Sequence, residues 1–392
     1  MSAREVYADY AATTRTAPEV LDAMRPWFEA GFGNPSSVHR RGEAAREAIE
    51  AARRQVAGLI GASPEEIVFT ASGSEANNLA LQGVLGSARG ERRRLVTSAI
   101  EHPSVLETAR ALESRGTPVT IVPVDERGRV RLDRLAASLG PDVALVSVMW
   151  ANNEVGTLQP VEEIAELARG AGARFHTDAV QAAGKLTINV ETLGVDLLSL
   201  AGHKFEGPPG AAALYVRRRT RLIPLIHGGH QERSRRAGTE NLPAIVGLGV
   251  AAERAARQMA SGEPERVRAL ADQLLDGLLQ RIPGAVLNGP RESRAPGIVN
   301  LRFPGVDGEA LLHALDEQGV TVSTGSACSA ASPGPSHVLI AMGLTPEQAH
   351  ASVRFSLGPG SIESDVQHIL AVTPPAIERL RALADSPARR SA

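Results

Sequence analysis

The chain has almost no cysteine, and the one it has stands in an unusual place. Cys328 is the only cysteine among 392 residues, so no disulfide can form within the chain. It lies in the stretch STGSACSAASPG (323–334), which offers few large apolar side chains for a buried thiol to pack against. An unpaired cysteine either packs as a small hydrophobic residue or takes part in chemistry. The local sequence leaves both alternatives open.

The sequence also lacks a strong net charge and long apolar runs. The net charge is −2, which argues against a protein dominated by binding to nucleic-acid phosphates. The arginine groups at 92–94 and 217–221 are interpreted as solvated surface. Apolar runs such as VALV are far too short to span a bilayer, and the polar first ten residues do not resemble a signal peptide. A lone thiol suits a reducing compartment, so we expect a cytoplasmic protein. The net charge and the short apolar runs further predict that it binds neither nucleic acid nor membrane directly.

Lysine is nearly absent as well. Of the 42 lysines and arginines only Lys185 and Lys204 are lysines. Arginine can replace lysine where a positive charge is enough, but not where a neutral amine must attack a carbonyl, because the guanidinium stays protonated. The two lysines are therefore candidate nucleophiles, with chance survival on the surface as the alternative. For Lys185, in AAGKLTIN, the sequence gives no reason to prefer chemistry.

Strand and helix patterns alternate over residues 65–216. Apolar, β-branched segments such as 67–70 and 143–150 are separated by amphipathic segments such as 103–116 and 160–172. This order predicts an α/β fold with a mainly parallel sheet covered by helices on both faces. Two long helical segments, 241–260 and 264–282, then lead to a smaller α+β unit, in whose last helix Pro374 and Pro375 predict a kink or a break. We predict a large domain over 15–258, and a small domain over 1–14 and 259–392 that carries the cysteine loop at about 323–335.

Several polar residues follow predicted strands, where ligands bind in open α/β sheets. Asp178 ends one strand, while Lys204, His102 and Asn153 each follow another. The turn ASGS (71–74) offers backbone N–H groups at a helix N-terminus, which suits a phosphate. Each feature alone has a structural explanation, as a cap, a turn or a satisfied polar residue. Together, a phosphate cradle, an acid and a lysine are what pyridoxal phosphate requires.

Motifs along nearly the whole chain carry a family resemblance. In order they are VYADYAATT, FGNPSSVHRRG, IVFTASGSEANN, EHPSV, NNEVGTLQP, HTDAVQAAGKL, LAGHKFEGPPGAAALYVRR, HGGHQERSRRAGTEN, TGSACSAAS and SVRFSLG. With these the chain resembles the cysteine desulfurases, relatives of the class V aminotransferases, and above all those that supply sulfur for iron–sulfur clusters and thio-cofactors. The resemblance implies a fold-type I pyridoxal phosphate enzyme. It also implies a homodimer with its active sites at the subunit interface, L-cysteine as substrate, L-alanine as product, and a sulfur-acceptor protein as partner.

The resemblance also implies roles for single residues. Lys204 would bind the cofactor covalently, His102 would stack on its ring and shuttle protons, and Cys328 would carry the substrate sulfur as a persulfide. The small residues and prolines of 323–335 favour an exposed loop for that task. The other implied contacts are Asp178 to the ring nitrogen, Asn153 and Gln181 to the ring hydroxyl, Gly73, Ser74, His203 and the partner subunit's Thr239 to the phosphate, and Arg354 with Asn34 to the substrate carboxylate.

Two positions depart from the family pattern. Ala201 stands where many relatives have a phosphate-binding serine, so one cofactor hydrogen bond is expected to be missing. Glu206 stands where an aromatic residue is commoner, which puts the local packing in question. Neither change removes a group needed for making or breaking bonds.

Other interpretations remain open at this stage. An aminotransferase or a selenocysteine lyase would use the same cofactor, although an aminotransferase would leave Cys328 without a role. A non-catalytic scaffold would not need both Lys204 and Cys328. The segment HGGH (227–230) could bind a metal, but it has no nearby third ligand, so no metal is predicted. The sulfur acceptor could be an iron–sulfur scaffold, a tRNA-thiolation relay or a DNA phosphorothioation system.

Overall fold

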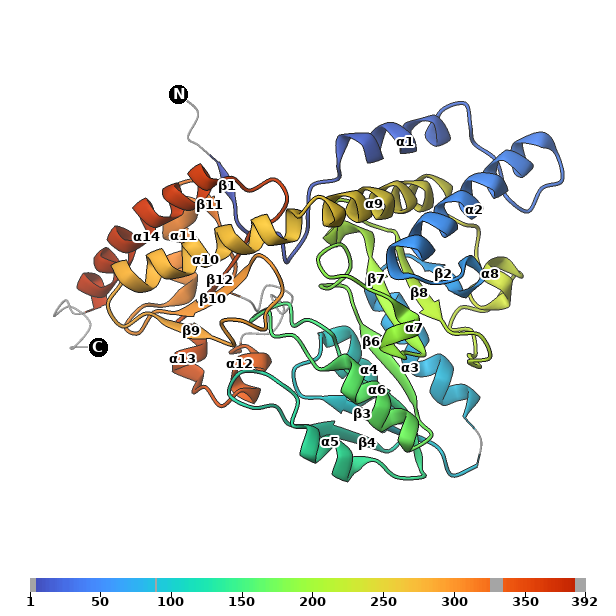
Figure 1. The fold of residues 1–392 in the computed structure, drawn as a ribbon, viewed down its shortest axis with the longest axis horizontal. Coiled ribbons are helices and arrows are strands. Elements are labelled where there is room, and N and C mark those ends of the chain that lie inside the picture. Colours follow the sequence, from blue (N-terminus) through green and yellow to red (C-terminus); the bar gives the residue numbers. More distant parts are fainter. Residues whose placement is uncertain (1–4, 89, 325–333, 385–392) are drawn as a thin grey trace.

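A seven-stranded sheet forms the centre of the larger part of the molecule (Figure 1). The structure is a computed structural model that describes residues 5–88, 90–324 and 334–384. The strand order is β2-β8-β7-β6-β5-β3-β4, in which β8 runs antiparallel to both neighbours and the other pairs are parallel. The predicted mainly parallel sheet is therefore confirmed. The strands are β2 (Ile67–Thr70), β3 (Arg94–Ser98), β4 (Val119–Val122), β5 (Val143–Ser147), β6 (Arg174–Asp178), β7 (Leu197–Ala201) and β8 (Ala212–Val216).

Helices cover both faces of this sheet, which explains why its strands are apolar on both sides. Within β2, Ile67 and Phe69 pack into one apolar core while Val68 faces a second one. The first core is covered by α2 (Arg40–Ile60), α6 (Val161–Gly170), α7 (Val190–Leu193) and α9 (Leu242–Ala260), with α1 (Pro18–Phe28) and α5 (Leu132–Ser138) at its edge. The second is covered by α3 (Gly73–Ser87) and α4 (Pro103–Glu113).

A separate apolar core holds the smaller part together, and α10 (Glu263–Arg281) links it to α9 (Figure 1). Its antiparallel sheet has the order β12-β10-β9, and β1 pairs in parallel with β11. Val6 and Ala8 pack in this core, so the N-terminal strand joins the C-terminal part. The exact domain boundaries stay a prediction. The elements of this part are β1 (Val6–Tyr7), β9 (Val286–Asn288), β10 (Ile298–Arg302), β11 (Val320–Thr321), β12 (Ser352–Ser356), α11 (Gly308–Asp316) and α14 (Glu363–Ala384). Two short helices between β11 and β12, α12 (His337–Ala341) and α13 (Pro346–His350), pack their buried apolar side chains into the first core instead.

Helix α14 continues through Pro374 and Pro375, so of the predicted kink or break the break is wrong, while the kink stays a prediction. A proline removes the N–H that would bond the carbonyl four residues earlier, which for Pro374 is the carbonyl of Leu370. Arg281 of α10 donates from Nη1 to that carbonyl at 2.8 Å. The neighbouring helix thus supplies the hydrogen bond that the local sequence cannot make.

Candidate active site

A cavity of about 210 Å³ opens at the carboxyl edge of the large sheet. Residues that follow or end β2, β3, β5, β6 and β7 form most of its wall, and β12 of the smaller sheet contributes one arginine. The predicted convergence of polar residues at this edge is therefore present. The lining residues are Ala11, Ala12, Ser72, Gly73, Ser74, Asn77, His102, Ser104, Met149, Asn153, Asp178, Val180, Gln181, Ala201, His203, Lys204 and Arg354.

Lys204 is held by backbone carbonyls at the wall of this cavity. It lies in the single 3₁₀ turn Gly202–Lys204 that follows β7. Its Nζ donates to the carbonyls of Ala11 and Ala12, both at 2.7 Å. Thr14 binds the same turn, since its backbone N–H and its Oγ1 both donate to the carbonyl of His203. The N-terminal segment therefore fixes where the amine stands.

Asp178 and His102 are joined by a polar chain. Nδ2 of Asn77 donates to Asp178 Oδ2 at 2.7 Å and to Ser104 Oγ at 2.9 Å, and Ser104 Oγ lies 2.8 Å from His102 Nδ1. The backbone N–H of Ser104 also donates to His102 Nδ1, which places the imidazole proton on Nε2. Burial lowers the pKa of His102, against the opposing effect of Asp178. His102 is thus neutral near pH 7. Its Nε2 carries the proton and can donate, while its Nδ1 already accepts from Ser104.

Asn77 and Ser104 were not singled out from the sequence. Asn77 lies four residues after Gly73 on α3, which places it on the same helix face as the cradle. Ser104 stands two residues after His102, in the first turn of α4. The helical spacing was a usable signal for Asn77. Nothing in the local sequence indicated that Ser104 would bind the histidine side chain.

The N-terminus of α3, where the sequence predicts an anion cradle, opens onto the cavity. Ser72 caps the helix by accepting from the backbone N–H of Glu75, and the N–H groups of the first turn are directed beyond the helix end. A Cβ at Gly73 would lie 2.9 Å from Val180 Cγ2 and 3.5 Å from Ala201 Cβ, so only glycine leaves this space open. Burial, with Lys204 and Lys185 nearby, lowers the pKa of His203 to about 4. The cradle therefore has a neutral imidazole beside it.

Arg354 reaches the cavity from β12. Its Nη2 donates to Asp9 Oδ1 at 2.6 Å and its Nη1 donates to the Asn153 carbonyl at 2.8 Å. Its Nε is buried and has no hydrogen-bond partner among the described residues. A buried guanidinium with an unmatched N–H is suited to an anionic ligand such as a carboxylate. Asp9, which holds this side chain in place, was not predicted from the sequence.

Two of the predicted site residues that the structure describes do not line the cavity of this chain. Asn34 is exposed in the loop before α2, and its Oδ1 accepts from the backbone N–H of Ser36. Thr239 lines a different hollow, beside Glu232, and the resemblance assigned it to the partner's site. Cys328 and most of its loop lie outside the described residues. The roles of these three residues stay predictions.

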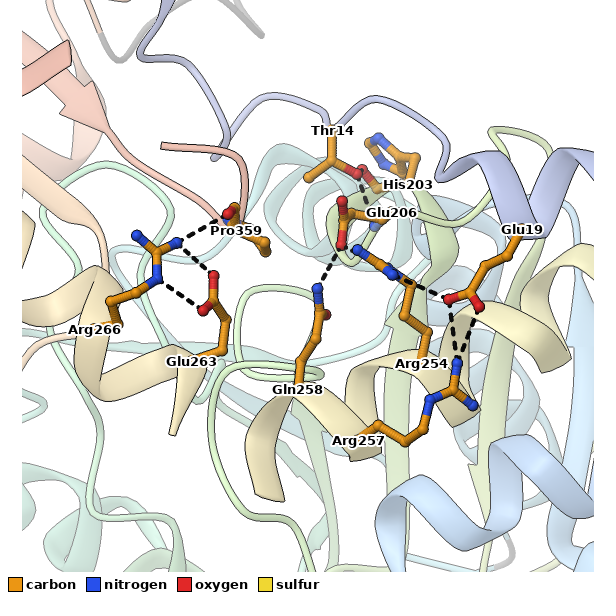
Figure 2. Close-up of polar contacts among 10 residues, drawn as sticks. All are labelled: Thr14, Glu19, His203, Glu206, Arg254, Arg257, Gln258, Glu263, Arg266 and Pro359. Atoms are coloured by element: carbon orange, nitrogen blue, oxygen red, sulfur yellow. Dashed lines mark hydrogen bonds and ion pairs between the residues drawn. The ribbon is translucent and has the colours of Figure 1, made fainter. Parts of the chain in front are cut away.

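Glu206, one of the two departures, is bound by polar contacts (Figure 2). Its carboxylate accepts from Arg254 Nε at 3.0 Å and from Gln258 Nε2 at 2.9 Å, both on α9. Its φ of 62° is uncommon for a residue other than glycine, and its backbone N–H donates to Thr14 Oγ1 at 2.8 Å. Arg254 in turn binds Glu19 of α1. These contacts tie the loop after Lys204 to two helices.

The segment HGGH gains no metal-binding neighbours. Among residues 5–88, 90–324 and 334–384, no three His, Cys, Asp or Glu side chains are grouped as metal ligands would be. His230 Nδ1 instead lies 3.1 Å from Ser234 Oγ. Within the same ranges, no helix is both long enough and apolar enough to cross a bilayer.

Comparison with known proteins shows which family the chain resembles. The family described as Aminotransferase class-V matches residues 6–369. The cysteine desulfurase IscS of Dictyoglomus turgidum is 47% identical over 97% of this chain and 96% of its own. A cysteine desulfurase of Gluconacetobacter diazotrophicus is 49% identical over 96% and 94%. A solved NifS-like protein superposes with a TM-score of 0.89 at 37% identity, covering 96% of this chain and 99% of its own.

The chain therefore belongs to the class-V aminotransferase family and has the fold of the fold-type I pyridoxal phosphate enzymes. Within that family it is a member of the cysteine desulfurases. The resemblance drawn from the motifs is confirmed.

Proposed function

We propose that this enzyme binds pyridoxal phosphate at Lys204 and converts L-cysteine to L-alanine, leaving the sulfur on Cys328. The observation that carries the proposal is the joint placement of Lys204, Asp178 and the N-terminus of α3 around one cavity. The residues present fit the cofactor: an amine, a buried carboxylate and an anion cradle that a Cβ at Gly73 would fill. When bound, pyridoxal phosphate supplies an electron sink that weakens bonds next to the amino-acid nitrogen.

The chain's own residues then have distinct tasks. Asp178 would hold the ring nitrogen, His102 would stack on the ring and carry protons at Nε2, and Asn153 and Gln181 would bind the ring hydroxyl. Gly73, Ser74 and His203 would hold the phosphate, and the partner subunit's Thr239 would complete the cradle in a homodimer. Arg354 binds the substrate carboxylate through the N–H that is unmatched among the described residues, with Asn34 assisting.

Sulfur transfer needs a second nucleophile, which we assign to Cys328. Its thiolate attacks the sulfur of the substrate, a new S–S bond forms, and the Cβ–S bond breaks. The electron pair of that bond returns to the substrate carbon, which takes up a proton and leaves as alanine. The persulfide on Cys328 then passes its outer sulfur to a thiol of an acceptor protein, in the cytoplasm, for iron–sulfur cluster or other thio-compound synthesis.

A second copy of the chain is part of the proposal. The segment around Asn34 carries apolar side chains that are exposed in the single chain: Phe28 by 68%, Phe32 by 60% and Val38 by 99%. It stands out from the body of the molecule between α1 and α2 (Figure 1). Exposed apolar surface of this kind is typical of a protein interface and supports the homodimer.

The proposal is tested by following the products from L-cysteine. We expect the purified protein, loaded with pyridoxal phosphate, to release alanine and sulfide in equal amounts when a thiol reductant is present. Formation of a keto acid instead would identify an aminotransferase, and a protein that takes up no cofactor would be a scaffold. Comparing kcat/KM for cysteine and selenocysteine separates a desulfurase from a selenocysteine lyase, which would turn over only the selenium substrate.

Ala201 gives a prediction about cofactor retention. Its side chain is buried in the cavity wall, next to the cradle. In the Ala201→Ser variant we expect an added hydrogen bond to the charged phosphate, worth about 1.5–3 kcal/mol at most. The variant should lose pyridoxal phosphate more slowly during dialysis, followed by absorbance. Ala182→Ser, at an alanine that is equally buried but does not line the cavity, is the control. Equal loss from Ala201→Ser and wild type would show that another group already binds that phosphate oxygen.

A further inference from the structure

The chain's only two lysines are linked at the active site through one amide and one carbonyl. Lys185 Nζ donates to Gln181 Oε1 at 2.7 Å, and Gln181 Nε2 donates to the Ala11 carbonyl at 2.8 Å. The same carbonyl accepts from Lys204 Nζ at 2.7 Å. Lys185 is thus one hydrogen bond from a cavity-lining side chain, although the sequence alone gave it no role.

The two ends of this link allow the Gln181 amide only one orientation. A backbone carbonyl can only accept, and Lys185 Nζ is the donor in its contact with Gln181 Oε1. The amide oxygen therefore faces Lys185 and the amide nitrogen faces Ala11. Without Lys185, the oxygen of this buried side chain would lose its donor. Among the described residues Nε2 has no second acceptor, which leaves its other hydrogen for a ligand in the cavity.

The backbone keeps this amide close to the loop that carries Lys204. Gly184 has a φ of 73°, which places it in the left-handed region, and a Cβ there would lie 2.8 Å from Phe205 Cβ. The turn 181–185 is therefore packed directly on the residue that follows Lys204. A change at Lys185 acts on Gln181 within a rigid frame rather than by moving the turn.

Charge couples the two lysines as well. Burial lowers the pKa of Lys185 to about 7, and Lys204 and Arg354 act in the same direction. Both lysines also lower the pKa of His203. Because the repulsion between two ammonium groups is mutual, a charge at position 185 favours the neutral, reactive amine at Lys204.

We propose that Lys185 is a positioning residue for the Lys204 site. It fixes the Gln181 amide with its donor toward the cofactor ring, and its charge helps to keep the Lys204 amine reactive. This inference rests on the proposed function, in which Gln181 contacts the ring hydroxyl. It accounts for a lysine at position 185 in a chain that otherwise uses arginine.

A double-mutant cycle on cofactor binding tests the first part. We expect Lys185→Met to weaken the affinity of the apo-protein for pyridoxal phosphate by about 5–10-fold, the usual effect of leaving one polar group unpaired. Lys185→Arg should keep most of the affinity, since it retains the charge and the donors. In a Gln181→Met background, Lys185→Met should add less than about twofold, because the partner is already gone. An equal loss in both backgrounds, or a lowered Tm with unchanged affinity, would overturn the positioning role.

Amine labelling of the apo-protein tests the second part without any cofactor. In Lys185→Met and Lys185→Arg, Lys204 is the only lysine, so acetylation measured by mass spectrometry reports that single side chain besides the N-terminus. At pH 6.5, below the pKa of about 7 of Lys185, we expect Lys204 to react roughly threefold more slowly in Lys185→Met than in Lys185→Arg. Equal rates would overturn the electrostatic coupling. If the wild type takes up no pyridoxal phosphate, the proposed function fails, whereas the labelling rates still decide whether Lys185 acts on Lys204.

Discussion

We expect Lys204→Ala to abolish turnover of L-cysteine and the visible absorption of bound pyridoxal phosphate. The reason is chemical, because the alanine has no amine with which to hold the cofactor. Lys185 cannot replace it, since its Nζ is bound to Gln181 and does not line the cavity. We expect activity to fall to the detection limit. The measurements are the absorbance spectrum and alanine formation on the same preparation.

Lys204→Arg is the matched control for this prediction. The guanidinium keeps the positive charge and can still donate to the Ala11 and Ala12 carbonyls, but it stays protonated and cannot attack a carbonyl. We expect it to preserve the Tm better than Lys204→Ala while remaining inactive. Full activity in either variant would contradict the assignment of Lys204 as the cofactor-binding residue.

Cys328→Ala should separate cofactor chemistry from sulfur transfer. In the proposed mechanism the thiol acts only after substrate and cofactor have combined. The variant should therefore still bind pyridoxal phosphate and still change its absorbance when L-cysteine is added. It should form almost no alanine and carry no persulfide, since no other thiol exists in the chain.

The alternative interpretation of Cys328 predicts a different pair of results. A cysteine that only packs in the interior would cost a small amount of stability when shortened, with turnover largely intact. Alanine formation and Tm, measured on one preparation, distinguish the two. Cys328→Ser serves as the control, because it keeps the size and polarity of the side chain without its nucleophilicity. Release of alanine at a near wild-type rate from both variants would show that Cys328 is not the nucleophile.

Much of the site was predictable because it follows strands that the sequence marks clearly. Asp178 is the last residue of β6 and Lys204 lies three residues after β7, and parallel strands bring their carboxyl ends to one edge. The hydrogen-bond partners that hold the site residues in place were not predictable. Asn77 binds Asp178 across 101 residues, and Asp9 binds Arg354 across 345. Contacts over such separations depend on how the elements pack, which no local pattern records.

The sequence by itself determined the chemistry of this protein: the order of strands and helices, the lysine, the acid, the glycine of the cradle and the family motifs. These depend on residue type and on short-range periodicity, which are properties of the chain alone. Only the tertiary structure decided that α14 would pass two prolines, because Arg281 of a neighbouring helix binds the freed carbonyl. It also decided that Lys185 stands beside Gln181 rather than on the open surface. Both outcomes depend on which distant groups the fold brings within hydrogen-bond distance.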